Sequence, residues 1–189
     1  MIGFGSPAGR VAVIGLGSVL MQDDAAGPHV LCRLEAELDL PPGVELLDLG
    51  TPGPELAHIV EGLDALIVID TLRVRGAEPG EVRLLRREEI LRGRQPERLS
   101  PHDPSLRGAL VAADLLGHAP AEVLLVGIIP SEVSLGLGLT PAVKAALPKA
   151  VEAVADELTR LGLQVSRRSL PGAAEIWWER GSALALPLS

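Results

Sequence analysis

Residues 65–70 read Ala-Leu-Ile-Val-Ile-Asp, and this stretch decides the expected fold. The run is short, uninterrupted and rich in β-branched residues, which is the pattern of a strand buried on both faces of a sheet. Similar apolar runs occupy residues 11–16 and 123–129. Because a strand buried on both faces needs a covering layer on each side, we expect an α/β fold.

Helical patterns alternate with these strands along the chain. We expect helices over residues 25–38, 54–61, 103–116 and 140–161, further strands over 44–49 and 81–85, and a mostly polar loop over 88–100. Asp23 is the expected N-cap of the first helix, and Pro148 should kink or split the last one. The alternation predicts a doubly wound, mostly parallel, twisted sheet of about five strands with helices on both faces.

The length and composition indicate one ordinary globular domain. The chain has 189 residues, of which 47% are hydrophobic and 22% charged, enough for a full core. We expect the α/β domain to span residues 1–162 and residues 163–189 to form an irregular C-terminal tail, which folds back over the core, meets a partner or stays loose. Cys32 is the single cysteine, so an internal disulfide is excluded, and a small buried hydrophobe is favoured over a catalytic thiol.

Charge and hydropathy exclude two classes of partner. The net charge of −8 argues against binding to nucleic acid. No apolar run reaches the roughly 18 residues that a bilayer span requires, and the first residues lack the pattern of a signal peptide. We therefore expect a cytoplasmic protein with neither nucleic-acid nor membrane partners.

Three polar side chains stand where a strand or a turn runs into a loop. Asp24 follows the strand 11–16 by one loop, Asp70 ends the strand 65–70, and His102 precedes the helix 103–116. Ligands of open α/β sheets bind beyond the carboxyl ends of the strands, so the two aspartates meet there if these strands are neighbours. Two carboxylates and one imidazole suit a divalent transition metal with open coordination positions. The positive end of a helix disfavours imidazolium, which favours the neutral, metal-binding form of His102.

Each of these side chains also has an ordinary structural explanation. Asp24 can complement a helix N-terminus, Asp70 can cap a turn, and His102 can be a loop histidine. An acidic residue at the end of an apolar strand nevertheless favours function. The other histidines, expected as surface or packing residues, are His29, His58 and His118.

Other catalytic patterns are not met. Gly15 and Gly17 resemble the start of a dinucleotide fingerprint, but Leu20 stands where the third glycine is needed. A Walker loop and a Gly-x-Ser-x-Gly nucleophile elbow are both absent from the sequence.

Six short motifs follow one another along the chain. They are GLGSVLMQDDAAG (15–27), Asp48-Leu49-Gly50-Thr51, ALIVID (65–70), Ser100-Pro101-His102, VGIIP (126–130) and the Gly-x-Gly-Leu-Thr-Pro segment (136–141). Their order resembles that of the nickel–iron hydrogenase maturation endopeptidases, over about Val11 to Leu161. The chain departs from the family pattern at Ser18, where asparagine is usual, and at Ala25, where glycine is usual. Both residues are small, so we expect activity to survive.

The resemblance implies a specific activity. Such enzymes remove a C-terminal extension from the hydrogenase large subunit after its nickel has been inserted, and the nickel belongs to the substrate and acts as the recognition signal. By position, Asp24, Asp70 and His102 would contact this nickel, and Asp70 and Asp24 would be the catalytic residues. Asp48 would orient these groups without contacting the nickel itself. A site with three protein ligands, two of them on loops, should be weak, so we expect the isolated protein to purify largely without metal.

Two mechanisms and two rival functions stay open at this point. Nickel either polarises the scissile carbonyl or a water molecule, or it only docks the substrate while an aspartate, preferably Asp70, acts as general base. The rivals are a non-proteolytic chaperone that senses nickel loading and another small metal-dependent hydrolase.

Overall fold

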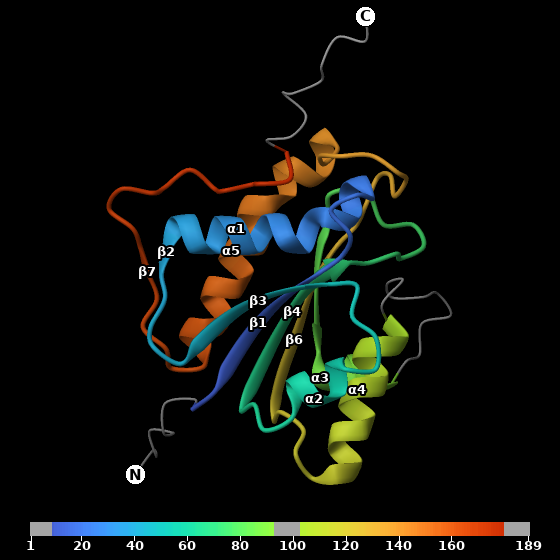
Figure 1. The fold of residues 1–189 in the computed structure, drawn as a ribbon, viewed down its shortest axis with the longest axis vertical. Coiled ribbons are helices and arrows are strands. Elements are labelled where there is room, and N and C mark those ends of the chain that lie inside the picture. The colour runs from blue at the N-terminus through green and yellow to red at the C-terminus, as the bar shows by residue number, and fades with distance from the viewer. Residues whose placement is uncertain (1–8, 93–102, 180–189) are drawn as a thin grey trace, which may run out of the picture.

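The computed structural model describes residues 9–92 and 103–179. At its centre is a five-stranded sheet with the strand order β3-β1-β4-β6-β5 (Figure 1). All of the pairings in this sheet are parallel except that of β5 with β6. The predicted α/β class with a mostly parallel sheet is confirmed. The strands are β1 (Val11–Leu16), β3 (Val44–Gly50), β4 (Ala65–Thr71), β5 (Val82–Arg86) and β6 (Glu122–Ile128).

The inner strands are the three apolar runs from which the fold was predicted. Every residue of β1 and β4 is buried, and in β6 only Glu122 is exposed. The edge strands β3 and β5 are only partly buried, because each has a neighbouring strand on one side alone. β1 pairs directly with β4 in the register Val11↔Ala65. The two strands that carry or precede the site aspartates are therefore neighbours, as expected.

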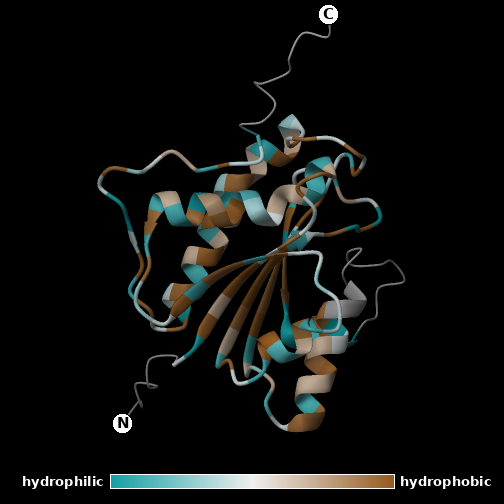
Figure 2. Ribbon diagram, in the orientation of Figure 1, coloured by the Kyte–Doolittle hydropathy of each residue, from teal (hydrophilic) through white to brown (hydrophobic). Residues whose placement is uncertain are grey.

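Helices cover both faces of the sheet, whose inner strands are hydrophobic along their length (Figures 1 and 2). One face is covered by α1 (Ala26–Glu37) and α5 (Pro141–Arg160), and the other by α2 (Leu56–Val60), α3 (Arg87–Arg92) and α4 (Asp103–Leu116). Within the described ranges, every helix is too short or too polar to span a bilayer.

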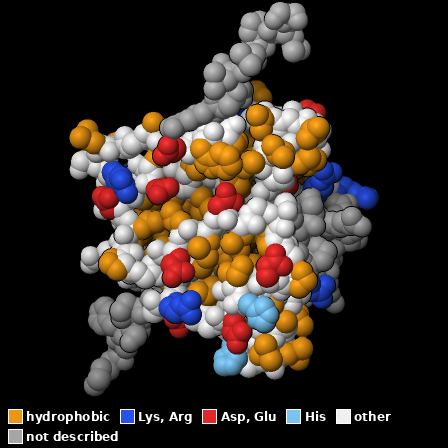
Figure 3. Space-filling view, in the orientation of Figure 1, with side chains coloured by type: hydrophobic (Ala, Val, Ile, Leu, Met, Phe, Trp, Pro, Cys, Tyr) orange, Lys and Arg blue, Asp and Glu red, His pale blue; other side chains and the backbone are white. Residues whose placement is uncertain are grey.

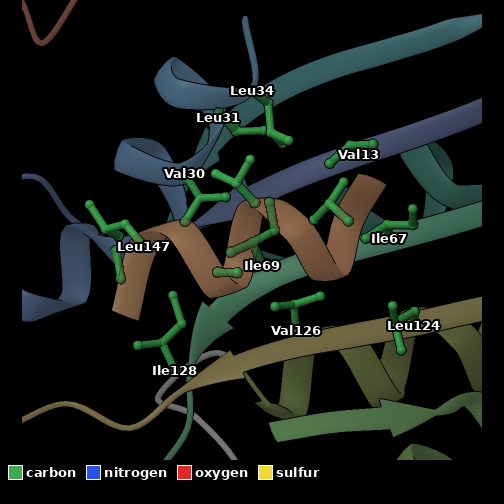
Figure 4. Packing of buried hydrophobic residues seen from close by; sticks show 14 of the residues in the cluster. Val13, Val30, Leu31, Leu34, Ile67, Ile69, Leu124, Val126, Ile128 and Leu147 are labelled. Atoms are coloured by element: carbon green, nitrogen blue, oxygen red, sulfur yellow. The ribbon is translucent and has the colours of Figure 1, made fainter. Parts of the chain in front are cut away.

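Alternation along the strands divides the core between these two layers. Val13 and Ile67 pack with α1 and α5, whereas Ile14 and Val68 pack with α2 and α4, because successive strand residues point to opposite faces. Figure 4 shows the first of these layers, where leucine and valine side chains of α1 meet Ile69 and its neighbours on the sheet.

Gly27 brings the first turn of α1 against the carboxyl ends of β1 and β4. A Cβ atom at this position would lie 2.3 Å from the carbonyl oxygen of Leu16 and 2.7 Å from that of Ile69. Since both atoms belong to backbone that cannot step aside, only glycine fits there. The start of α1 is thereby fixed over the strand ends, where α/β sheets bind their ligands.

Two local predictions are wrong, and one of the two alternatives in a third is excluded. Asp23 does not cap α1, which begins at Ala26 with Ala25 as its N-cap, because Asp23 lies inside a preceding 3-10 helix, η1 (Gln22–Ala25). Residues 88–92 of the stretch expected as mostly polar loop (88–100) belong to helix α3, since burial of Ile90 stabilises a turn of helix; residues 93–100 lie outside the described residues. Pro148 does not split α5, which is one helix of 20 residues, because its buried face outweighs one lost backbone hydrogen bond.

The segment after α5 is described up to residue 179 and runs back along α1 (Figure 1). Leu163 belongs to the core, and β7 (Ser166–Arg167) pairs antiparallel with β2 (Leu38–Asp39). The backbone N–H groups of Arg168 and Gly172 then donate to carbonyls at the end of α1, at 2.9 and 3.0 Å. Trp178, near the end of the described segment, is buried.

Candidate active site

Asp24 is a buried carboxylate at the carboxyl end of β1. It is 4% exposed. Its Oδ2 accepts a hydrogen bond of 2.7 Å from the backbone N–H of Ser18, and its Oδ1 accepts one of 3.1 Å from Thr71 Oγ1. The loop that carries it needs Gly17, whose φ is +123° and where a Cβ would lie 1.7 Å from the carbonyl oxygen of Asp24. The tight turn after β1 thus aims Asp24 across the sheet toward β4.

Asp70 occupies the equivalent place on the neighbouring strand. It lies near the end of β4, opposite Gly127 of β6, and is 3% exposed. Its Oδ1 accepts a hydrogen bond of 2.7 Å from the backbone N–H of Thr71. Thr71 therefore contacts both carboxylates, one through its hydroxyl and one through its backbone. The bond from the Thr71 hydroxyl therefore places Asp24 at the end of β4, one residue along the chain from Asp70.

His102 lies outside the residues that the structure describes. Among those that it does describe, there is no group of three or more His, Cys, Asp or Glu side chains arranged to hold a metal ion. The described part of the site therefore consists of Asp24, Asp70 and Thr71, and the chain passes from His102 directly into α4.

Asp48 is connected to this site only through backbone. Its side chain is exposed, and its Oδ1 accepts a hydrogen bond of 3.1 Å from the N–H of Gly50. The carbonyl of Gly50 accepts a bond of 2.8 Å from the N–H of Gly17, next to the Ser18 amide that binds Asp24. The carboxylate of Asp48 thus shapes the end of β3, against which the Asp24 loop rests.

Asp23, expected as a helix cap, instead holds the long loop between β6 and α5. Its carboxylate is fully buried and accepts four hydrogen bonds. Three come from the backbone N–H groups of Ser131, Glu132 and Thr140, at 2.9, 3.0 and 2.7 Å. The fourth comes from the hydroxyl of Thr140 at 2.9 Å. One side chain therefore ties both ends of the loop to the residue beside Asp24.

A groove of about 590 Å³ opens beyond the ends of β4 and β6, within the size range of ligand sites. It begins three residues after Asp70, and it includes the loop residues whose amides bind Asp23. The groove therefore adjoins the strand ends that carry the site. Its lining residues are Arg73, Val74, Arg75, Ala77, Ile129, Pro130, Ser131, Glu132 and Val133.

The remaining histidines have structural positions, as the sequence favoured. His58 and His118 are exposed. His29 is buried in α1, with its ring edge-to-face with that of Trp178 at 5.2 Å and its Nε2 3.4 Å from Glu179 Oε1. Burial lowers the pKa of His29 more than the nearby Glu179 raises it. His29 thus packs as a neutral ring beneath the C-terminal segment.

Cys32 is also covered by this segment. Its Sγ lies 3.6 Å from the carbonyl oxygen of Glu175. Burial, with Glu35 and Asp48 nearby, raises the pKa of the thiol. A thiol with a raised pKa is a poor nucleophile at neutral pH, which agrees with the packing role favoured from the sequence.

Comparison with known proteins identifies the family to which this chain belongs. A family model described as hydrogenase maturation protease matches residues 28–157. The chain is 35% identical over 159 residues to the hydrogenase 2 maturation protease of Escherichia coli, covering 84% of this chain and 96% of the relative. The chain belongs to the hydrogenase maturation proteases. It is therefore a peptidase, as the motifs implied.

Two further comparisons, one of sequence and one of structure, agree with this assignment. The hydrogenase expression/formation protein HupD of Bradyrhizobium diazoefficiens is 33% identical over 163 residues, which cover 86% of this chain and 84% of HupD. The solved structure of the hydrogenase maturating endopeptidase HybD of E. coli superposes with a TM-score of 0.79 at 36% identity, over 85% of this chain and 98% of HybD. This maturation protease thus shares both sequence and fold with the family.

Sequence reasoning missed two residues in and beside the site of this protease. Thr71 directly follows Asp70 at the end of an apolar strand. Its position in the sequence does not indicate that its hydroxyl binds Asp24, which lies in the segment after β1. Asp23 was noticed, but its position before a helix favoured a capping role. The available signal of another role for Asp23 was that it adjoins Asp24. One carboxylate is enough to cap a helix, so two adjacent ones before the same helix indicate that at least one has a different role.

Proposed function

We propose that this maturation protease removes a C-terminal extension from a nickel–iron hydrogenase large-subunit precursor after nickel has been inserted. The observation that carries the proposal is the hydrogen bond from Thr71 Oγ1 to Asp24, which places this buried carboxylate at the end of β4, next in sequence to the buried Asp70. In a member of this family, two buried carboxylates at the ligand-binding edge of the sheet are the natural candidates for the reacting groups.

The substrate's nickel is recognised, in this proposal, by Asp24, Asp70 and His102. A carboxylate offers about four lone-pair positions, and the hydrogen bonds from Ser18 and Thr71 use two of those of Asp24. The carboxylate is thus oriented and still able to face a cation. His102 completes a nitrogen and oxygen ligand set suited to a divalent transition metal, and the substrate supplies the remaining ligands.

Hydrolysis of the peptide bond then needs a base beside the bound nickel. Asp70 takes a proton from water as the water oxygen attacks the scissile carbonyl, and that proton passes to the leaving amine as the C–N bond breaks. The nickel docks the precursor in this orientation and draws electron density from the carbonyl oxygen. Thr71 orients both carboxylates, Asp24 through its hydroxyl and Asp70 through its backbone N–H.

Asp48 acts as a positioning residue in the same scheme. Its bond to Gly50 stabilises the turn whose carbonyl holds Gly17, and thereby the loop of Asp24. Because this route runs through backbone, the loss of Asp48 should lower the rate less than the loss of either site aspartate.

The test uses a candidate large-subunit precursor from the same genome, prepared with and without nickel. Mass spectrometry follows the C-terminus of the precursor after incubation with the purified protease. We expect cleavage of the nickel-loaded form alone, abolished in Asp24→Ala, Asp70→Ala and His102→Ala. Asp39→Ala and His58→Ala are matched controls, because the side chains of Asp39 and His58 are 64% and 85% exposed.

Other outcomes assign other functions. Nickel-dependent binding with an intact precursor would indicate a chaperone that senses nickel loading. Hydrolysis of small substrates, with the precursor left intact, would indicate a different metal-dependent hydrolase. Equal cleavage of the nickel-free precursor would refute the role of nickel as signal. Metal analysis of the purified protease should find little bound nickel, because the nickel arrives with the substrate, and we place the reaction in the cytoplasm.

A further inference from the structure

Three leucine side chains project into solvent beside the loop that carries Asp24. Leu135 is 83% exposed, Leu20 is 56% exposed and Leu137 is 45% exposed. Figure 3 shows hydrophobic side chains gathered at the upper edge of the molecule, over the loop between β6 and α5. Single exposed leucines are ordinary, but a group of them indicates an interaction surface.

Backbone pairing places the three leucines together. The N–H of Gly136 donates to the carbonyl of Leu20 at 2.9 Å, and the N–H of Gln22 donates to the carbonyl of Gly136 at 3.0 Å. These bonds form a short parallel bridge between Met21 and Gly136. Leu20 therefore lies beside the segment in which Leu135 and Leu137 flank Gly136. We call these three side chains the leucine patch.

The leucine patch is held rigidly relative to the site. The carboxylate of Asp23 binds Ser131 and Glu132 before the patch and Thr140 after it. Ser134 Oγ donates to Gln22 Oε1 at 2.9 Å, which joins the same two loops once more. A surface fixed in advance loses little conformational entropy when a partner binds. These bonds therefore fix the position of the leucine patch relative to Asp24, the residue after Asp23.

We propose that the leucine patch docks an apolar segment of the polypeptide substrate and so presents the scissile bond to Asp24 and Asp70. This inference rests on the proposed function, in which the substrate is a large-subunit precursor. Three leucines cover far less than the roughly 800 Å² per partner of a stable interface. The area suits an enzyme that must release its product, and it is too small for a stable pairing of two copies.

The site and the adjoining groove support a polypeptide as the occupant. The groove is lined by Ser131, Glu132 and Val133, which directly precede the patch along the loop. An extended chain lying on the leucine patch can therefore continue past the strand ends of Asp24 and Asp70 into the groove. An apolar segment also avoids repulsion by a protein of net charge −8.

The test measures kcat and KM for cleavage of the nickel-loaded precursor. Leu135→Ser combined with Leu137→Ser, and Leu20→Ser alone, remove apolar contact from two different loops. We expect KM to rise roughly 5- to 30-fold with kcat unchanged, the range for loss of one or two interface contacts. Leu115→Ser is the matched control, because Leu115 is also 83% exposed but lies on α4, over the opposite face of the sheet.

Each contrary result has its own meaning. Unchanged KM in the patch variants, or an equal rise in Leu115→Ser, would overturn the docking role. A fall in kcat at constant KM would show that the leucines act on site geometry instead. A dimer of the wild type, seen by sedimentation velocity and lost in the double variant, would assign the patch to a second copy. Failure of the wild type itself to cut the precursor would refute the proposed function, and is distinguishable from all of these.

Thermal unfolding checks that the leucine variants are as stable as the wild type, so that their kinetic constants can be compared. Serine at an exposed leucine position should change the free energy of unfolding by less than about 0.5 kcal/mol. Should the double variant unfold, Leu20→Ser carries the test, because it leaves the β6–α5 loop sequence intact.

Discussion

Replacement of Asp23 by alanine tests whether one buried carboxylate holds the loop between β6 and α5. The substitution removes the acceptor of four hydrogen bonds, from Ser131, Glu132 and Thr140. A hydrogen bond to a charged group contributes about 1.5–3 kcal/mol. Ser131 and Glu132 are exposed, so water can replace part of what their amides lose. We therefore expect the free energy of unfolding to fall by about 4 kcal/mol.

The size of this effect separates two roles for the same side chain. Loss of a helix N-cap costs about 1 kcal/mol, so a capping aspartate would show only a quarter of the expected loss. Asp23→Asn should lie between, at about 2 kcal/mol, because the amide keeps one acceptor oxygen but turns an NH₂ group toward an N–H donor.

Urea denaturation at pH 7 measures these differences, and thermal unfolding should show a decrease in Tm of roughly 8–16 °C for the alanine variant. Asp39→Ala is the control, because Asp39 is 64% exposed and pairs with Arg168 at 3.3 Å. Such a surface pair contributes less than about 1 kcal/mol. A loss of 1 kcal/mol or less for Asp23→Ala, or a loss equal to that of the control, would refute the reasoning.

Three further predictions concern packing, charge and catalysis. Gly27→Ala should destabilise the fold by several kcal/mol in urea denaturation, roughly 3 or more, since its Cβ would meet strand backbone. Gly108→Ala is the contrasting substitution, because Gly108 has open space around it in α4. It should stabilise the fold by about 0.5–1 kcal/mol. Burial raises the pKa of Glu157, but hydrogen bonds from two arginines outweigh it and leave the pKa lowered. The stabilisation is thus present above the unfolded-state pKa and lost as pH falls through the folded-state pKa. Glu157→Gln should therefore be less stable than wild type at pH 7, by roughly 2 kcal/mol, and the difference should disappear at acidic pH, below the folded-state pKa. Thr71→Val should lower kcat of precursor cleavage about tenfold, the equivalent of one hydrogen bond to Asp24, and Thr71→Ser should restore it; equal rates in all three proteins would contradict the role of the hydroxyl.

Local pattern predicted most of the fold. The runs that became β1, β4 and β6 were recognisable because a strand buried on both faces leaves an uninterrupted apolar stretch in the sequence. Elements that depend on tertiary packing were harder. Helix α3 lies largely in a stretch expected as mostly polar loop, since its polar surface hides the single buried Ile90. Pro148 was expected to kink or split α5, and the buried face of this helix prevents the split.

The site divides in the same way. Asp24 and Asp70 could be proposed from the sequence, because each stands at the end of an apolar run in a recognisable motif. The sequence by itself therefore determined the α/β class, the family resemblance and the two carboxylates, all of which depend on residues close together along the chain. Only the tertiary structure decided that the Thr71 hydroxyl binds Asp24, and that Asp23 holds a loop. The partners in these contacts are 47 residues apart in the first case and up to 117 in the second, and hydrophobic periodicity carries no information on contacts at such separations.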